Sequence, residues 1–188
     1  FISYVMRQAG TRNSDGFVVS IRHMTYIVNA LLNRKNRDLD RPFWLYDAAQ
    51  ISPNVGDILC KPWHETPCES ISLTSLESQY IEESPSGEFI LKGRPSGHSH
   101  TDIVVKRFSD EGIEYIEALG GNTGDLTGVA HTVGRKRWRL DANGRVDSRV
   151  DSDNQPIDDC LPFAYIRIVH PSLDQFLEAA SSQGGTLV

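Results

Sequence analysis

The sequence predicts an α+β fold, with N-terminal helices packed on a central antiparallel sheet. Between residues 1 and 34, apolar side chains recur at the three-to-four-residue spacing of helices. After Gly97 the spacing changes to two, and short turn sequences separate the alternating segments. Helices followed by a run of strands are typical of helices covering one face of an antiparallel sheet. The length of 188 residues fits a single domain over 1–188.

Two helices are expected near the start of the chain. Phe1, Val5 and Met6 fall on one helical face, and Gly10 is a helix stop. Because this pattern begins on an apolar residue without a capping side chain, its helix is expected to begin upstream of Phe1. A second helix is predicted over 21–34. Its apolar stripe consists of Ile21, Tyr26, Ile27, Ala30 and Leu31.

Strands are predicted where short apolar runs lie between turns. They cover 43–46, 58–60, 101–107, 113–119, 129–140 and 163–169. The third and fourth are joined by a loop containing Gly112 and predict a hairpin, and the glycines of 120–124 predict a second tight turn. The stretch from 61 to 97 is rich in Pro, Ser and Glu and predicts a long irregular insertion. A short helix is expected over 171–180 and a frayed tail over 181–188.

Composition and charge exclude several kinds of protein. The 19 Lys and Arg residues against 25 Asp and Glu give a net charge of −6, which argues against nucleic acid as the main partner. No apolar run approaches the roughly 18 residues of a membrane-spanning helix, and no signal-peptide pattern is present. The odd number of cysteines does not make a disulfide framework. Cys60 could pair with Cys68, leaving Cys160 over, or all three could be buried thiols.

His100 is the residue that most suggests chemistry. It lies at the mouth of a predicted strand, where a rigid backbone would hold an imidazole that still reaches the edge of the sheet. A histidine in such a position suits a general base, because its pKa lies near neutrality. The alternative is an exposed histidine in a loop.

The predicted hairpin brings two polar residues toward His100. If its loop centres near Asp110, residues pair when their numbers sum to about 220, which places His100 opposite Gly120 and close to Asn122. An Asn beside a His can fix the tautomer of the imidazole, as the third member of a catalytic triad does. Asn122 is therefore the first candidate to orient His100, and Glu117, deeper in the hairpin, is the second. A turn residue with positive φ is the alternative for Asn122.

Two other groups of residues suggest less specific roles. Zinc-type ligands occur at Cys60, His64 and Cys68, with His98 and His100 downstream, but their spacing matches no standard zinc finger and two prolines interrupt them. We therefore expect neither a metal nor another cofactor. The basic run 135–139 predicts a strand whose charges alternate into solvent around a tryptophan, with a docking patch for an anionic polymer as the alternative.

The segment 1–10 (FISYVMRQAG) closely resembles the nucleophile helix of the NlpC-type and CHAP-type papain-like cell-wall hydrolases. In that family a Cys, or a Ser in some uncharacterised bacterial relatives, precedes the position of Phe1 by three residues. The segment 55–59 (VGDIL) resembles the family's strand entry of Pro, Gly, Asp and a hydrophobic residue. The surroundings of Trp44 also resemble a less characterised bacterial branch.

Two further motifs extend the resemblance. The segment 100–105 (HTDIVV) resembles the family's histidine-bearing strand, with Asp102 where a small residue is usual. The segment 119–124 (LGGNTG) resembles the segment that carries the third polar residue. The four motifs follow the family's order and cover roughly residues 1–139.

The resemblance implies a papain-like fold and a cysteine endopeptidase or amidase that cuts stem-peptide amide bonds of peptidoglycan. His100 would transfer the proton, Asn122 or Glu117 would orient it, and the nucleophile would precede Phe1. Such an enzyme acts in the periplasm or after secretion. An antibacterial toxin is one version of this function, with an immunity or inhibitor protein as a further partner.

Two other functions are compatible with the same fold. A non-catalytic cell-wall-binding module would keep the cleft without the nucleophile, and the residue three positions before Phe1 distinguishes it from the enzyme. An acyltransferase or esterase would use the same groups on another substrate, which fold alone does not decide.

Overall fold

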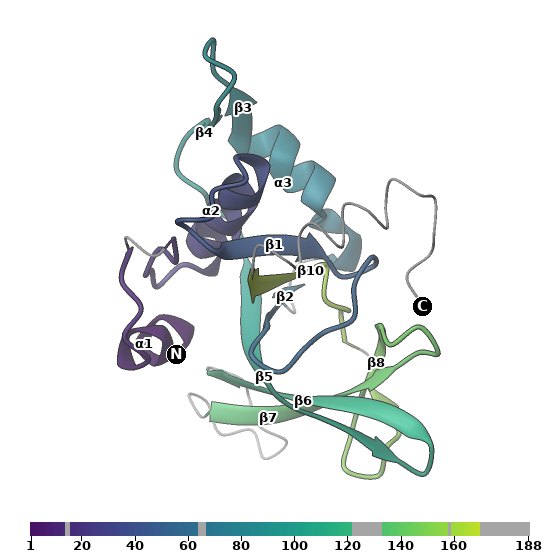
Figure 1. Cartoon of the computed structure of the whole chain (residues 1–188). Coiled ribbons are helices and arrows are strands. Elements are labelled where there is room, and N and C mark those ends of the chain that lie inside the picture. The colour runs from purple at the N-terminus through teal and green to yellow at the C-terminus, as the bar shows by residue number, and fades with distance from the viewer. Residues whose placement is uncertain (14–15, 64–66, 122–132, 158, 170–188) are drawn as a thin grey trace.

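The computed structural model describes all residues except 14–15, 64–66, 122–132, 158 and 170–188. The fold is α+β, as predicted, and is built on a large sheet in which every neighbouring pair is antiparallel (Figure 1). In their order across the sheet, the strands are β1 (Phe43–Asp47), β10 (Ala164–Ile168), β2 (Ile58–Pro62), β5 (Ser99–Asp110), β6 (Ile113–Gly121), β7 (Val133–Leu140), β8 (Val146–Val150) and β9 (Pro156–Ile157). The predicted helix over 171–180 and the tail over 181–188 lie outside the described residues.

Both expected N-terminal helices are present, as α1 (Ile2–Gln8) and α2 (His23–Lys35). α2 packs on β1, with Ile27, Val28 and Leu31 among its buried residues. The prediction was wrong at Ile21, which lies before α2 and is 97% exposed. The apolar side chain of Ile21 therefore does not occupy a position in the core.

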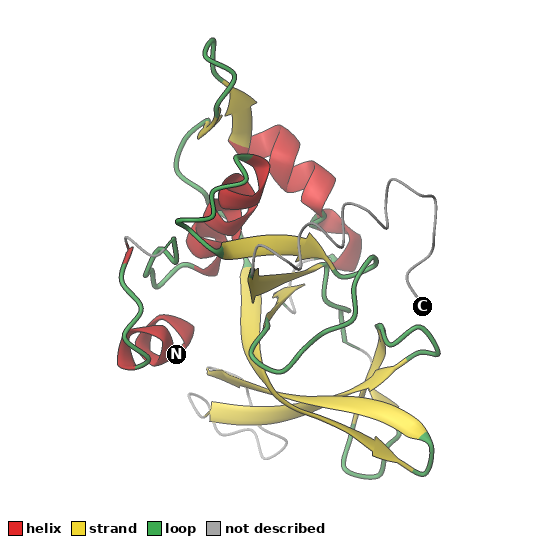
Figure 2. Ribbon diagram, viewed as in Figure 1, coloured by secondary structure: helices red, strands yellow, loops and turns green. Residues whose placement is uncertain are grey.

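The prediction of a long irregular insertion over 61–97 is wrong for much of its length. It contains a 3-10 turn (Cys68–Ser70), the helix α3 (Leu73–Tyr80) and a hairpin of β3 (Ile81–Glu83) and β4 (Phe89–Leu91). Ser72 caps α3 through the backbone N–H of Ser75, and helical spacing brings Leu76 and Tyr80 into the core. The helices therefore do not all precede the strands, and α3 lies beside α2 while α1 stands apart (Figure 2).

The sheet carries hydrophobic side chains on both faces. On one face Ile58 and Ile166 join the helices around Ile27 in the larger core. On the other face Leu59 and Trp138 belong to a second cluster. Because strand residues alternate between faces, consecutive residues such as Ile58 and Leu59 enter different cores. β5 therefore has a buried side chain on each face near its beginning.

The predicted hairpin is confirmed, but its register differs from the prediction by two to three residues. The loop consists of Glu111 and Gly112, both with positive φ, so it is not centred on Asp110. A bulge between Val104 and Lys106 shifts the pairing once more. A Cβ on Gly120 would consequently lie nearest to Asp102, with His100 also close.

A disulfide links Cys68 to Cys160, so both expectations for the cysteines were wrong: Cys60 does not pair with Cys68, and the three cysteines are not all free thiols. Cys60 is fully buried in β2 as a free thiol. The bridge joins the insertion to the segment before β10 over a separation of 92 residues. It therefore closes a long loop that would be unconstrained in the unfolded chain.

We expect reduction of this bridge to destabilise the protein substantially. Closing a loop of this length stabilises a fold by about 4.6 kcal/mol in the chain-entropy account. The unfolding midpoint in urea should fall when dithiothreitol is added, and a Cys68→Ser/Cys160→Ser double variant should show the same lowered midpoint without reductant. A midpoint of the double variant that equals the oxidised wild type would contradict this expectation.

Candidate functional site

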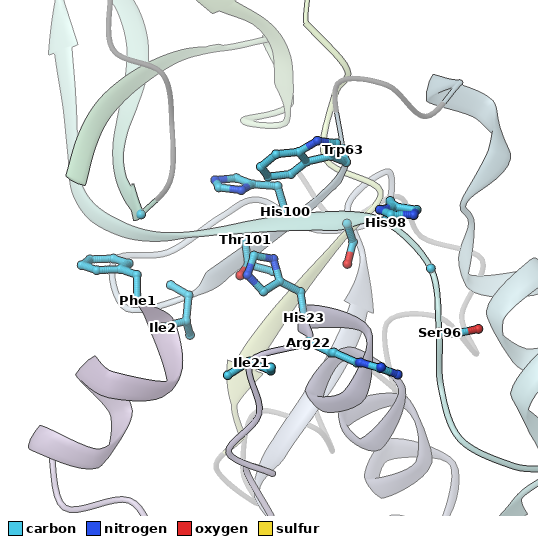
Figure 3. Close-up of a pocket in the computed structure, with 13 residues that line it drawn as sticks. Phe1, Ile2, Ile21, Arg22, His23, Trp63, Ser96, His98, His100 and Thr101 are labelled. Carbon is cyan, nitrogen blue, oxygen red and sulfur yellow. The ribbon is translucent and has the colours of Figure 1, made fainter. Parts of the chain in front are cut away.

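A cleft of roughly 700 Å³ lies where the beginnings of α1, α2 and β5 meet (Figure 3). The first turn of α1 contributes Phe1 and Ile2, and the start of α2 contributes Arg22 and His23. His100 enters from β5. Three elements from distant parts of the sequence thus line the same cleft.

His100 is the most buried ionisable group of this cleft, with 2% of its surface exposed. Its Nε2 lies 2.9 Å from Oδ1 of Asp102, while its Nδ1 is buried and has no hydrogen-bond partner among the described residues. A carboxylate beside Nε2 favours the tautomer of His100 in which the ring proton is on Nε2. Nδ1 is then the acceptor, which leaves it available to take a proton from a group in the cleft.

Asp102 is fully buried and is also held by Lys136, which is a cation. Nζ of Lys136 lies 3.1 Å from Oδ1 and 2.9 Å from Oδ2 of this carboxylate. Burial would raise the pKa of Asp102, but the hydrogen bond from His100 and the charge of Lys136 outweigh it and lower that pKa to about 2. Asp102 is therefore ionised at neutral pH.

The pKa of His100 is lowered, because burial disfavours the imidazolium more than Asp102 favours it. The positive charges of Lys136 and Lys61 act in the same direction as burial. A lowered pKa keeps the ring neutral at physiological pH. The imidazole is thus in the state that accepts a proton.

Two glycines at the end of β6 make room for the site. A Cβ on Gly120 would lie 1.6 Å from Oδ1 of Asp102 and 3.0 Å from Nε2 of His100. A Cβ on Gly121 would lie 2.3 Å from Cβ of Phe1, so this glycine admits the first turn of α1. The prediction of a turn over 120–124 was wrong for Gly120 and Gly121, which are strand residues.

We expect Gly120→Ala to destabilise the protein and displace the Asp102 carboxylate. The added methyl group would overlap buried atoms that cannot move without breaking hydrogen bonds, which costs about 1–3 kcal/mol. Denaturant unfolding measures the loss. Gly93→Ala is the matched control, because nothing lies within 4 Å of a Cβ at Gly93. Equal unfolding midpoints for the two variants would contradict the close approach at Gly120.

Two aromatic rings flank His100 in the cleft. The ring centroid of Trp63 lies 5.3 Å from that of His100, and the ring centroid of His23 lies 5.6 Å from it (Figure 3). Nδ1 of His23 is also buried without a hydrogen-bond partner among the described residues. Burial and the neighbouring His100 lower the pKa of His23 to about 4.

The lowered pKa of His23 predicts a loss of stability in mild acid. Between pH 6.5 and about 4 the unfolded chain protonates His23 while the folded protein resists it, so stability falls as the pH falls through this range. We expect His23→Gln to lose less stability than the wild type between pH 7.5 and 4.5, as measured by urea unfolding. Parallel losses in the two proteins would contradict this assignment.

Residues 1–167 match the family described as an uncharacterized protein conserved in bacteria (DUF2272). The chain belongs to this family. No curated protein and no solved structure was found to match the chain. The match covers every element that lines the cleft of this DUF2272 member.

The three residues predicted for the site of this DUF2272 member have different outcomes. His100 lies in the cleft. The carboxylate of Glu117 binds Arg135 and Arg137 on the neighbouring strand, whereas Asp102 is the carboxylate that contacts His100. Asn122 lies outside the described residues.

Asp102 and Lys136 are members of the site that were not predicted from the sequence. His100 and Asp102 are two residues apart in one strand, so their side chains lie on the same face, a signal that the sequence contains. The prediction that the charges of 135–139 point into solvent is wrong for Lys136, which is buried, although burial does alternate along the strand. Trp138 is fully buried, Lys136 beside it faces the same interior, and Arg137 between them binds Glu117.

The cysteines of the DUF2272 chain do not supply a metal site or a nucleophile among the described residues. Cys68 is bonded to Cys160, and burial raises the pKa of the Cys60 thiol well above its usual range. His64 lies outside the described residues. No group of three metal-ligating side chains occurs in the part of the chain that the structure describes. That part also contains no helix long and apolar enough to cross a membrane.

Proposed function

We propose that the chain is a papain-like cell-wall hydrolase that cleaves a stem-peptide amide bond of peptidoglycan. One observation carries the proposal. The neutral Nδ1 of His100 is unpartnered among the described residues, and Asp102 holds its ring in a cleft that begins at the first turn of α1. The family resemblance assigns the nucleophile to the residue three positions before Phe1, which a longer chain would bring to this end of α1.

In the proposed reaction, Nδ1 of His100 accepts the proton of the upstream thiol or hydroxyl as that group attacks the amide carbonyl. The imidazolium then donates the proton to the leaving amine, and an acyl-enzyme remains. A water molecule, deprotonated by the same nitrogen, hydrolyses the ester or thioester and restores the enzyme. Backbone N–H groups at the start of the nucleophile helix would stabilise the oxyanion.

Asp102 takes the orienting role that the sequence analysis gave to Asn122 or Glu117. Its bond to Nε2 of His100 fixes the tautomer, and its negative charge stabilises the imidazolium that forms. Lys136 keeps this carboxylate ionised and in place. A role for Asn122 stays a prediction.

The disulfide between Cys68 and Cys160 supports a site of action outside the cytoplasm. Disulfides persist in oxidising compartments such as the periplasm and the extracellular space. An enzyme in the periplasm or the extracellular space can reach peptidoglycan. The proposal of an antibacterial toxin, with an immunity protein as partner, is consistent with this location.

Purified peptidoglycan and a chain that includes the native residues before Phe1 test the function. We expect soluble muropeptides to be released, with new amine and carboxyl ends, and replacement of the residue three positions before Phe1 by alanine should stop the release. Binding without release would indicate the non-catalytic module. Cleavage of a panel of acyl esters without muropeptide release would indicate the esterase.

A further inference from the structure

We propose that the start of α2 forms a carboxylate-binding subsite, so that the cleft selects substrates with a free carboxylate near the scissile amide. The inference deepens the proposed function and rests on it, because it names a substrate class for the same cleft. Three observations carry it: the charge of the cleft lining, the uncapped helix start and a buried hydroxyl group without a partner among the described residues.

The lining of the cleft is cationic although the whole chain has a net charge of −6. Arg22 lines it, and no Asp or Glu is among the described residues that do. Arg22 is exposed, and within the described part of the chain its guanidinium forms no ion pair. An anionic ligand would therefore meet an unpaired cation and no opposing carboxylate.

The start of α2 adds backbone donors to this cation. Arg22 is the N-cap residue of the 13-residue helix, it provides no side-chain cap, and the first turn contains no acidic residue. The first N–H groups of a helix, here those of His23 and Met24, have no acceptor within the helix. Together with the helix dipole, these donors favour a negative charge at this end of the helix.

One buried side chain points to a ligand independently of the helix. Ser99 is 8% exposed, it lines the cleft, and its Oγ has no partner among the described residues. Buried polar atoms are normally hydrogen-bonded. The Ser99 hydroxyl can donate a hydrogen bond to an oxygen of the ligand. A carboxylate or a peptide carbonyl provides such an acceptor oxygen.

The occupant that fits these groups is a peptide carboxylate. A guanidinium binds a planar carboxylate through two parallel hydrogen bonds, and one cation balances one negative charge. A phosphate group carries more charge and commonly meets several cations, whereas Arg22 is the one Lys or Arg residue in the described lining. A peptide also places an amide bond within the same ligand, beside His100.

The test measures binding to a chain that includes the residues before Phe1, with the residue three positions before Phe1 replaced by alanine so that peptides stay intact. The probes are a synthetic stem-peptide fragment with free carboxylates, the same fragment with its carboxylates amidated, and inorganic phosphate. We expect the acid to bind about tenfold more tightly than the amide. Arg22→Gln should remove this difference, and Arg145→Gln, in the turn between β7 and β8, should keep it.

Several results would overturn the inference. Equal affinities for acid and amide, no measurable binding of either peptide, or an unchanged preference in Arg22→Gln would each exclude the subsite. Phosphate that competes as strongly as the peptide acid would exclude the carboxylate preference. Failure of the proposed function is separable, because carboxylate-dependent binding can persist in a chain that releases no muropeptides, and release can occur without the preference.

Discussion

Replacing His100 by alanine is expected to abolish muropeptide release by the chain that includes its upstream residues. The proposed reaction routes each proton transfer through Nδ1 of His100, and general acid–base catalysis by one positioned group contributes about 10²- to 10⁴-fold to a rate. Loss of the base also leaves the nucleophile without activation, so the residual rate should fall to the lower limit of the assay.

The neighbouring histidine provides the control for this prediction. His98 lies two residues earlier, is exposed and reaches the same cleft, so His98→Ala should keep the rate within a few-fold of the wild type. Added imidazole should restore part of the activity of His100→Ala, because the deleted ring leaves a space lined by Asp102. Unchanged release by a folded His100→Ala variant would remove the catalytic assignment.

Replacing Asp102 by asparagine is expected to reduce both activity and stability. The amide loses the charge that stabilises the imidazolium, and the rate should fall by roughly 10²- to 10⁴-fold. Lys136 would be left as an unpaired buried cation, and breaking a buried ion pair costs about 3–5 kcal/mol. Urea unfolding and the muropeptide assay measure the two losses separately.

Lys136→Met separates the structural from the catalytic role of this ion pair. The charge of Lys136 lowers the pKa of His100, so its removal should raise that pKa and move the acidic limb of the activity profile to higher pH. The double variant Asp102→Asn/Lys136→Met should regain stability relative to Asp102→Asn, because no unpaired charge remains, while staying inactive. An acidic limb that does not move in Lys136→Met, or activity in the double variant, would contradict the assignment.

Local sequence patterns were sufficient to predict much of the sheet and one site residue. The hairpin of β5 and β6 and the strand β10 follow from alternation and turn residues alone. His100 was found because its strand position is visible in the sequence. These features are determined by residues that lie a few positions apart in the sequence. The periodicity of apolar residues reveals such short-range patterns directly.

The rest of the site depends on contacts between distant residues. Lys136 reaches Asp102 only because β5, β6 and β7 are adjacent in the sheet, and the loop at Glu111 and Gly112 sets the register that brings Gly120 beneath that carboxylate. The bond between Cys68 and Cys160 likewise joins segments that no local pattern relates. Such contacts between distant residues depend on the tertiary fold. Patterns within a single sequence therefore do not predict them.

The place of β10 in the sheet has a consequence for biosynthesis. This last described strand lies between β1 and β2, which are made much earlier, so a growing chain cannot complete that part of the sheet until residues 164–168 have left the ribosome. Until then, the facing edges of β1 and β2 expose unpaired backbone groups that favour aggregation. Newly made copies therefore depend on residues 164–168 to protect these edges, and a chaperone that shields them would suit this topology.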